Sequence, residues 1–249
     1  MAREQVLEGI ILRRWTWGES DRMVSFLSET RGKLRLRVRG TQKPNSRMGM
    51  LTEPLNLLRV RLIEGRNQPL LVQPQLIRTY FRVRADLERL TAALALCETL
   101  DRWLAEDYAE PEAYHTLVQA LNALEIGRDV DSTVAWALWR WLALLGYAPD
   151  LHHCRGCGRP TQQGDWWIQT GGCLCAICRP PQTGGAPSVT AEQIQLVRSW
   201  LTGQGCPLTS MPSAGRLAQT ALRYAESVVD AEPRWLTFWE RLNTLRENG

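Results

Sequence analysis

The spacing of hydrophobic residues changes at about Tyr80, and this change divides the chain into two parts. From Val6 to Tyr80, short runs alternate between hydrophobic and polar residues, which is the period of a β-strand. After Tyr80, hydrophobic residues recur every three or four positions, which is the period of a helix with one apolar face. The sequence therefore predicts an α+β chain, with a β domain followed by an all-helical domain.

Five strands fit the first part, with turn residues such as Gly18, Gly32 and the segment 40–49 between them. The predicted strands are Val6–Arg14, Met23–Ser28, Lys33–Arg39, Leu55–Glu64 and Leu70–Tyr80. Five short strands favour a small barrel, and the oligonucleotide-binding (OB) barrel is the common five-stranded form. Periodicity alone leaves another small barrel open. We expect residues 1–80 to form an OB-fold nucleic-acid-binding domain.

The second part, residues 81–249, contains six predicted helices. They span residues 85–107, 112–124, 134–145, 190–201, 213–229 and 233–246. Thr190 and Gln193 form a capping-box pattern at the start of the fourth helix. A segment rich in Gly, Pro and Cys, residues 151–187, interrupts the helical pattern. We therefore expect an all-helical domain with an insert.

Charge is distributed unevenly along the chain. Residues 1–80 hold 15 basic and 7 acidic residues, a net charge of +8, whereas the remainder has a net charge of -4. A basic N-terminal domain on a nearly neutral scaffold indicates an anionic partner, and nucleic acid is the simplest one.

The third predicted strand carries the clearest pattern. Leu34, Leu36 and Val38 alternate with basic residues, so one face is core and the other is a basic stripe. Residues 31–47 contain seven positive charges and no negative one. The candidate nucleic-acid contacts are Lys33, Arg35, Arg37, Arg39, Lys43, Arg47, Arg13, Arg14, Arg59 and Arg61. Trp15, Trp17 and Phe26 are candidate stacking platforms or core residues. The alternative is a solvated basic face that keeps an edge strand from aggregating.

Five of the seven cysteines lie between Cys154 and Cys178. Two CxxC motifs, Cys154–Cys157 and Cys175–Cys178, have the spacing of a closed four-cysteine zinc site, which is structural. Cys173 is a spare residue that leaves the ligand assignment open. The alternative is a metal-free thiol hairpin or a disulfide pair.

Several functions and locations find no support in the sequence. There is no phosphate-binding GxxxxGK[ST] loop, no GxSxG motif and no His-x-Glu element of a zinc deaminase, so we expect binding without catalysis. There is no secretory signal and no apolar run long enough to span a bilayer. With the clustered cysteines, this predicts a cytoplasmic protein that does not enter a membrane.

Short motifs in both parts resemble those of the RecO family of bacterial recombination mediators, over essentially the whole length. In the first part the motifs are Gly9–Arg13, Gly18–Arg22, Gly32–Leu34, Arg39–Gly40, Lys43–Arg47 and Glu53–Pro54. In the second part they are Leu144–Tyr147, Cys154–Gly158 and Gly171–Gly172 shortly before Cys175 and Cys178.

The resemblance implies an OB domain, a helical domain, a zinc-binding insert and no catalytic turnover. It implies binding to single- and double-stranded DNA, with Lys33, Arg35, Arg37, Arg39, Lys43 and Arg47 as contacts and the four cysteines as zinc ligands. It also implies annealing of complementary strands, action with RecR, recognition of the acidic C-terminal tail of single-stranded DNA-binding protein, and help in loading RecA at gaps and breaks. A protein of this kind would be associated with the bacterial nucleoid when bound to DNA. Arg140, near Trp136 and Trp139, would suit such a tail.

Two other functions remain open at the level of sequence. One is an RNA-binding or translation-associated protein, in which the OB barrel and the zinc insert grip folded RNA. The other is a protein-interaction scaffold whose basic face meets an acidic partner.

Overall fold

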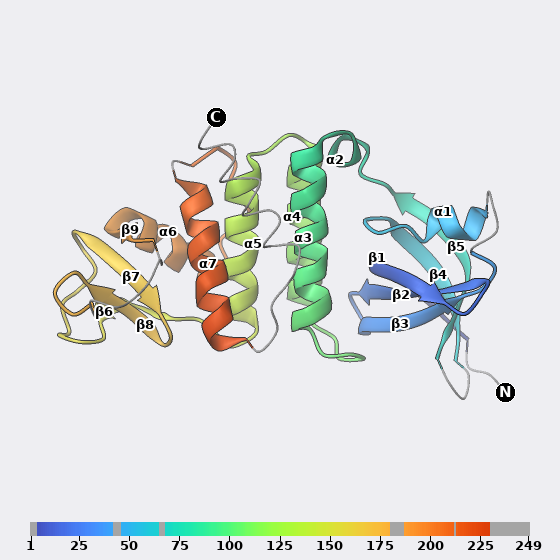
Figure 1. Ribbon diagram of the computed structural model, residues 1–249, viewed down its shortest axis with the longest axis horizontal. Coiled ribbons are helices and arrows are strands. Elements are labelled where there is room, and N and C mark those ends of the chain that lie inside the picture. Colours follow the sequence, from blue (N-terminus) through green and yellow to red (C-terminus); the bar gives the residue numbers. More distant parts are fainter. Residues whose placement is uncertain (1–3, 42–45, 65–67, 180–186, 212, 230–249) are drawn as a thin grey trace. The chain divides into compact units, whose positions relative to one another are not determined.

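The computed structural model describes residues 4–41, 46–64, 68–179, 187–211 and 213–229 (Figure 1). These residues form two compact units, one that ends at Glu125 and one that begins at Ile126. None of the helices in these ranges is both long and apolar enough to cross a membrane.

The first unit begins with a closed five-stranded barrel, which confirms the predicted strand content. Its strands are β1 (Glu4–Trp17), β2 (Asp21–Ser28), β3 (Gly32–Val38), β4 (Leu57–Ile63) and β5 (Leu70–Arg78). They follow the order β1-β2-β3-β5-β4 around the barrel, and β1 closes it by pairing with β4. β3 and β5 are parallel, whereas the other neighbours are antiparallel. This topology is that of the OB fold.

The barrel interior is apolar and includes residues from every strand. Leu34, Leu36 and Val38 of β3 are buried there with Phe26 of β2, as the alternation predicts. Burial of these side chains is the main favourable term that holds the barrel closed.

Two details of the barrel differ from the sequence prediction. β1 is longer than predicted, and its register shifts between Ile11 and Arg13, which is a bulge that lets the strand bend. The predicted break at 40–49 contains the start of a short helix, α1 (Arg47–Leu51). The Ser46 side chain caps α1 by accepting a hydrogen bond from the Gly49 N–H at 3.2 Å.

Three helices complete the first unit: α2 (Phe81–Ala85), α3 (Leu87–Trp103) and α4 (Pro111–Glu125). α3 contacts β1 and α4 contacts β2. Ile10 and Leu27 alternate with the core residues Ile11 and Phe26, so they point out of the barrel, yet both are buried. Helices therefore cover one end of the outer surface of β1 and β2.

α3 ends earlier than the predicted residue 107 because the chain beyond it pairs with the barrel. Leu104 is buried, and the Asp107 N–H donates to the Lys33 carbonyl oxygen at 2.8 Å. Glu106 lies beside Lys33 in an isolated parallel bridge. A tertiary contact with β3 thus replaces the last predicted turn of the helix.

The second unit contains α5 (Val130–Leu144), α6 (Ala191–Leu201) and α7 (Ala214–Val228). α5 packs against α6 and α7, and Trp136, Trp139 and Trp141 are buried in this core. The predicted capping box at Thr190 and Gln193 is present. The predicted helix at 233–246 lies outside the described residues.

The insert, to which the sequence analysis assigns no strands, forms a small sheet together with the residues that flank it. Its strands are β6 (Asp150–Cys154), β7 (Asp165–Gln169), β8 (Gly172–Cys175) and β9 (Val189–Thr190), in the order β6-β8-β7-β9. Trp166 and Ile168 on β7 are buried.

Candidate nucleic-acid interface and metal centre

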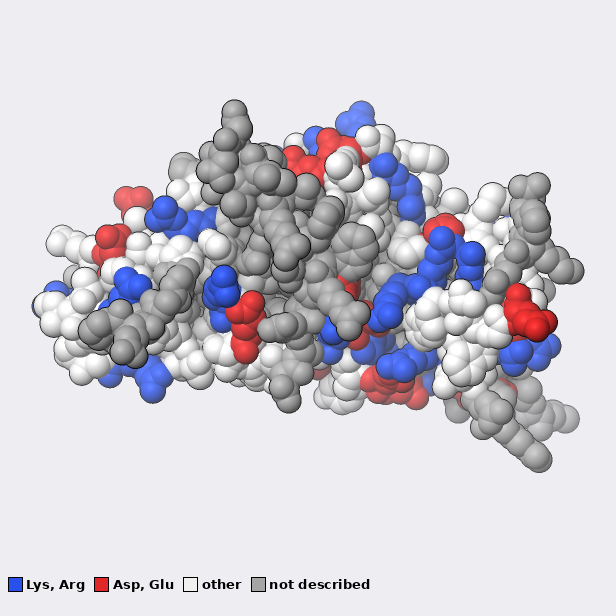
Figure 2. All heavy atoms as spheres, viewed as in Figure 1, with Lys and Arg blue, Asp and Glu red and all other residues white. Residues whose placement is uncertain are grey.

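The outer surface of β1, β2 and β3 brings together arginines that are far apart in sequence. The register places Arg13 of β1 and Arg35 of β3 on either side of Ser25, and Trp15 and Arg37 on either side of Met23. We call the surface formed by Arg13, Trp15, Arg35, Arg37 and Arg39 the basic face. Lys and Arg side chains gather over the barrel in Figure 2, with acidic side chains between them.

Acidic side chains accompany three arginines of the basic face. The Arg35 Nε lies 2.5 Å from a Glu106 carboxylate oxygen, and the Arg37 Nη2 lies 2.6 Å from one of Asp21. Arg13 is 3.7 Å from Asp101. These three arginine side chains remain 41 to 55% exposed, so each can offer further N–H donors to a ligand.

Lys33 lies on the outward side of β3, as predicted, but it is not exposed. Its ammonium donates to the Asp101 carbonyl oxygen at the end of α3, and the residue is only 5% exposed. Burial lowers the pKa of Lys33. The alternation of residues correctly predicted the side of the strand to which Lys33 points. It could not predict that a helix covers this side chain.

Arg39 and Arg47 are exposed, and neither has an ion-pair partner within the described ranges. Lys43, the other basic residue of the loop after β3, lies outside the described residues. The exposed positive charge of residues 31–47 is thus concentrated at the end of β3 and the start of α1.

The remaining predicted contacts lie elsewhere on the barrel. Arg59 and Arg61 of β4 pair with Glu8 and Glu4 of β1, and β5 separates them from β3. Arg14 forms an ion pair with Glu53. The structure does not bring these three arginines together with the basic face. The charges of Arg59 and Arg61 are instead neutralised by glutamates on the neighbouring strand β1.

The three candidate stacking residues have different environments. Phe26 is buried in the barrel core. Trp15 is partly buried, with the Arg13 guanidinium 5.6 Å from its ring centroid, and Trp17 is 51% exposed. Trp15 and Trp17 therefore remain candidates for base stacking, and Phe26 does not.

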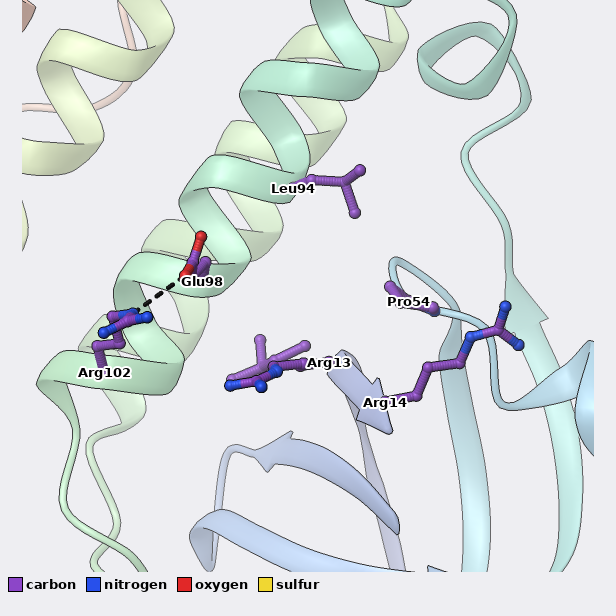
Figure 3. Close-up of a pocket in the computed structure, with 7 residues that line it drawn as sticks. Arg13, Arg14, Pro54, Leu94, Glu98 and Arg102 are labelled. Carbon is purple, nitrogen blue, oxygen red and sulfur yellow. Dashed lines mark hydrogen bonds and ion pairs between the residues drawn. The ribbon is translucent and has the colours of Figure 1, made fainter. Parts of the chain in front are cut away.

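A pocket lies between β1 and α3 at the Arg13 end of the basic face. Its lining residues are Leu12, Arg13, Arg14, Pro54, Leu94, Glu98 and Arg102. Figure 3 shows Arg13 extending from β1 towards α3, where Glu98 and Arg102 form an ion pair of 3.0 Å. The arginines of the pocket are thus paired with carboxylates. The pocket therefore offers less unpaired positive charge than the C-terminal end of β3.

The four cysteines of the CxxC motifs converge in the insert. Their sulfur atoms all lie within 4.8 Å of one another, with Cys154 and Cys157 at 3.7 and 3.8 Å from Cys175. A tetrahedral zinc with Zn–S bonds of about 2.3 Å has sulfurs about 3.8 Å apart. The cluster, Cys154, Cys157, Cys175 and Cys178, can therefore hold a metal ion.

Backbone groups favour the thiolate form of Cys154. Burial would raise the pKa of this thiol, but the N–H groups of Cys175, Cys157 and Gly156 together lower it to about 6. Gly156 also allows the close approach of the second motif, because a Cβ there would lie 2.8 Å from the Cys178 sulfur.

Cys173 lies apart from the cluster. Its thiol donates to the His153 carbonyl oxygen at 3.4 Å, and burial raises its pKa to about 12. The structure therefore places Cys175, and not Cys173, among the four candidate ligands.

Arg140 lies in the second unit, where its guanidinium donates to the Leu201 carbonyl oxygen at the end of α6 at 3.4 Å. Trp136 and Trp139 beside it in sequence are buried core residues. The role of Arg140 in peptide binding stays a prediction.

The fold and the two sites define a class of protein: an OB-fold protein with a basic outer face and a four-cysteine insert. The family model described as Recombination protein O N terminal matches residues 1–80, and the one described as Recombination protein O C terminal matches residues 84–209. The chain belongs to the RecO family of DNA repair proteins.

Individual relatives agree with this assignment. The chain is 33% identical over 235 residues to the DNA repair protein RecO of Nocardioides sp., covering 92% of each chain. It is 34% identical over 203 residues to that of Cutibacterium acnes, covering 79% of this chain and 81% of the relative. It is 31% identical over 238 residues to that of Roseiflexus sp., covering 93% of this chain and 83% of the relative.

Proposed function

We propose that the chain is a recombination mediator that binds single- and double-stranded DNA on the basic face and anneals complementary strands. With RecR and single-stranded DNA-binding protein it helps to load RecA at gaps and breaks in the bacterial cytoplasm. It acts by binding, without catalytic turnover. The observation that carries the proposal is the placement of Arg35 and Arg37 on β3, with Arg39 directly after it, across β2 from Arg13 and Trp15 of β1.

Strand geometry supports a phosphate track along β3. Outward residues on one strand are about 6.8 Å apart, close to the phosphate spacing of an extended nucleic acid strand. Arg35, Arg37 and Arg39 can thus meet successive phosphates, with Arg47 beyond them, and Lys43 stays a contact proposed from the sequence alone. Annealing requires two like-charged strands to approach, and arginines that neutralise phosphate charge reduce this repulsion.

Four of the predicted contacts do not belong to the proposed track. Lys33 is buried under the end of α3. Arg14, Arg59 and Arg61 pair with carboxylates away from β3. We propose residues 1–80 as the DNA-binding domain and residues 81–249, with the insert 151–187, as the helical part of the chain, of which α2 to α4 belong to the same compact unit as the barrel.

We propose zinc as the metal of the four-cysteine cluster, since the sulfur spacing and all-thiolate donor set suit a closed structural site. The ion would hold the ends of β6 and β8 together with the turns that follow them. The chain's own residues contribute the backbone N–H groups that stabilise the thiolates.

The decisive experiment uses complementary DNA strands coated with single-stranded DNA-binding protein. We expect the intact chain to accelerate annealing and the double variant Arg35→Gln, Arg37→Gln to lose this acceleration. The matched control is Arg59→Gln, Arg61→Gln, which removes the same charge from β4. Binding of the first variant to single-stranded DNA should also depend less steeply on salt, by a slope of about 0.7 for each lost phosphate contact.

The control distinguishes a local track from a general effect of charge. Equal losses in the two double variants would contradict a track on β3. No acceleration by the intact chain would contradict the mediator function itself.

For the acidic tail of single-stranded DNA-binding protein we retain Arg140 as the proposed contact. Competition by a tail peptide should weaken in Arg140→Ala, because the charge that meets the peptide carboxylates is lost. Peptide competition that is the same in both proteins would remove Arg140 from the site.

A further inference from the structure

A buried carboxylate lies on the same side of the sheet as the arginines of the basic face. Asp21 begins β2, and its residue is only 7% exposed. One carboxylate oxygen, Oδ2, accepts from Arg37 Nε at 2.8 Å and from Arg37 Nη2 at 2.6 Å. The other oxygen, Oδ1, accepts from the Gly40 N–H at 3.0 Å and from the Ser20 hydroxyl at 3.2 Å.

The contacts to Arg37 fix the direction of its guanidinium. An arginine has five N–H donors in a planar fork, and Asp21 engages two of them. The Arg37 side chain is 41% exposed, so the remaining three donors can face a ligand in one defined orientation.

The contact to Gly40 fixes the loop that follows β3. Gly40 has a φ of +66°, and its carbonyl oxygen accepts from the Ser46 hydroxyl at 2.8 Å. Ser46 in turn caps α1, which begins with the exposed Arg47. Asp21 therefore holds one end of a hydrogen-bonded chain that leads from Arg37 to the start of α1.

Asp21 is ionised under ordinary conditions. The Gly40 N–H, followed by the Arg37 hydrogen bond, lowers its pKa. A permanent negative charge on a DNA-binding face repels phosphate. Its presence there is therefore explained only by a structural role that outweighs this repulsion.

We propose that Asp21 is a positioning residue of the DNA-binding face, which orients Arg37 and the loop at Gly40 for phosphate contact. Its removal should weaken DNA binding although it makes the face more positive. This inference rests on the proposed function, because it requires Arg37 to contact DNA.

Glu106 provides a matched comparison on the same face. Its carboxylate also pairs with an arginine of β3, Arg35, at 2.5 Å, but its side chain is 46% exposed. Replacing Asp21 or Glu106 by its amide changes the net charge equally. A simple charge effect predicts tighter DNA binding for both variants, whereas the positioning role predicts opposite results.

The experiment measures the dissociation constant of the full chain for a single-stranded oligonucleotide over a range of salt concentrations. For Asp21→Asn we expect the constant to rise about tenfold. The slope of its logarithm against the logarithm of salt should become shallower by about 0.7, the value for one phosphate contact on a single strand. For Glu106→Gln we expect tighter binding and no shallower slope.

If Asp21→Asn lowers the melting temperature of the protein below the assay temperature, a second variant tests the positioning role. Arg37→Lys keeps the charge but lacks the planar fork, so it should also weaken binding and make the salt dependence shallower. Unchanged binding in Arg37→Lys would overturn the proposal. So would tighter or unchanged binding in a folded Asp21→Asn variant.

The DNA track on β3 and the positioning role of Asp21 can be overturned separately. If Arg35→Gln, Arg37→Gln loses DNA binding while Asp21→Asn does not, the positioning role alone is overturned. If the arginine double variant binds DNA normally, the proposed track fails, and the inference fails with it.

Discussion

Basic residues that look equivalent in the sequence differ in their surroundings. Lys33 and Arg35 occupy alternate positions of the same strand face, yet Lys33 is buried under α3 while Arg35 is exposed beside Glu106. Periodicity fixes the side of the strand to which a side chain points. It does not tell which distant element covers that side, so the exposure of Lys33 could not be predicted.

The acidic partners were likewise missed by sequence reasoning. Asp21 sits in the conspicuous Gly18–Arg22 motif, but nothing local indicates that it reaches Arg37, 16 residues away. The available signal was its place two residues before the predicted strand Met23–Ser28, next to the basic strand, which allows a diagonal cross-strand contact once that strand is extended.

Gly32 offers a test of the contact between the segment after α3 and the barrel. Its φ is +68°, and an added Cβ would lie 1.8 Å from the Tyr108 carbonyl oxygen. We expect Gly32→Ala to lower the free energy of unfolding by about 3 kcal/mol, from left-handed backbone strain together with displacement of this segment. Chemical denaturation monitored by tryptophan fluorescence measures the change.

Gly40 supplies the control for Gly32, because its φ is +66° and an added Cβ would meet nothing within 4 Å. Gly40→Ala should cost only the strain, about 1 kcal/mol. Equal losses of stability in the two variants would contradict a close packing of Tyr108 on β3.

At the level of elements, the strands and most helices were predictable because each has a clear hydrophobic period. The five barrel strands and α4 to α7 agree with their predicted positions within a few residues. The end of α3 was wrong because Glu106 and Asp107 pair with β3. The sheet of the insert was missed because its strands are short and its glycines and cysteines obscure the alternation.

The insert should depend on its metal for stability. Cys175→Ser removes a ligand from the four-sulfur cluster, so we expect the variant to lose the bound zinc and the second unit to unfold at lower temperature. Cys173→Ser is the matched control two residues away, since that thiol faces the His153 carbonyl oxygen. Metal content per chain, measured together with the melting temperature, checks both.

The comparison between the two cysteines is decisive for the ligand assignment. Zinc lost from Cys173→Ser and retained in Cys175→Ser would reverse it. Zinc absent from the intact protein would leave the cluster as a set of free thiols.

For the whole molecule, composition predicted which part of the chain carries the positive charge better than it predicted how that charge is arranged. The net charge of +8 in residues 1–80 correctly singled out the barrel as the basic domain. It did not reveal that Arg59 and Arg61 are balanced by Glu8 and Glu4 across the β1–β4 pair. A charge count includes every charged residue equally. The electrostatic potential of a surface depends on which charged residues lie next to each other in the folded protein.

On the proposed DNA track, the cover that α3 places over Lys33 would limit the length of DNA that one molecule holds on β3. The open part runs from Arg35 to Arg39, about 14 Å, which is enough for about three phosphates. A footprint this short would let each molecule release a strand readily. In the proposed annealing function, two partly matched strands could then separate and pair again in a better register, so the closed end of the face would keep errors in annealing reversible.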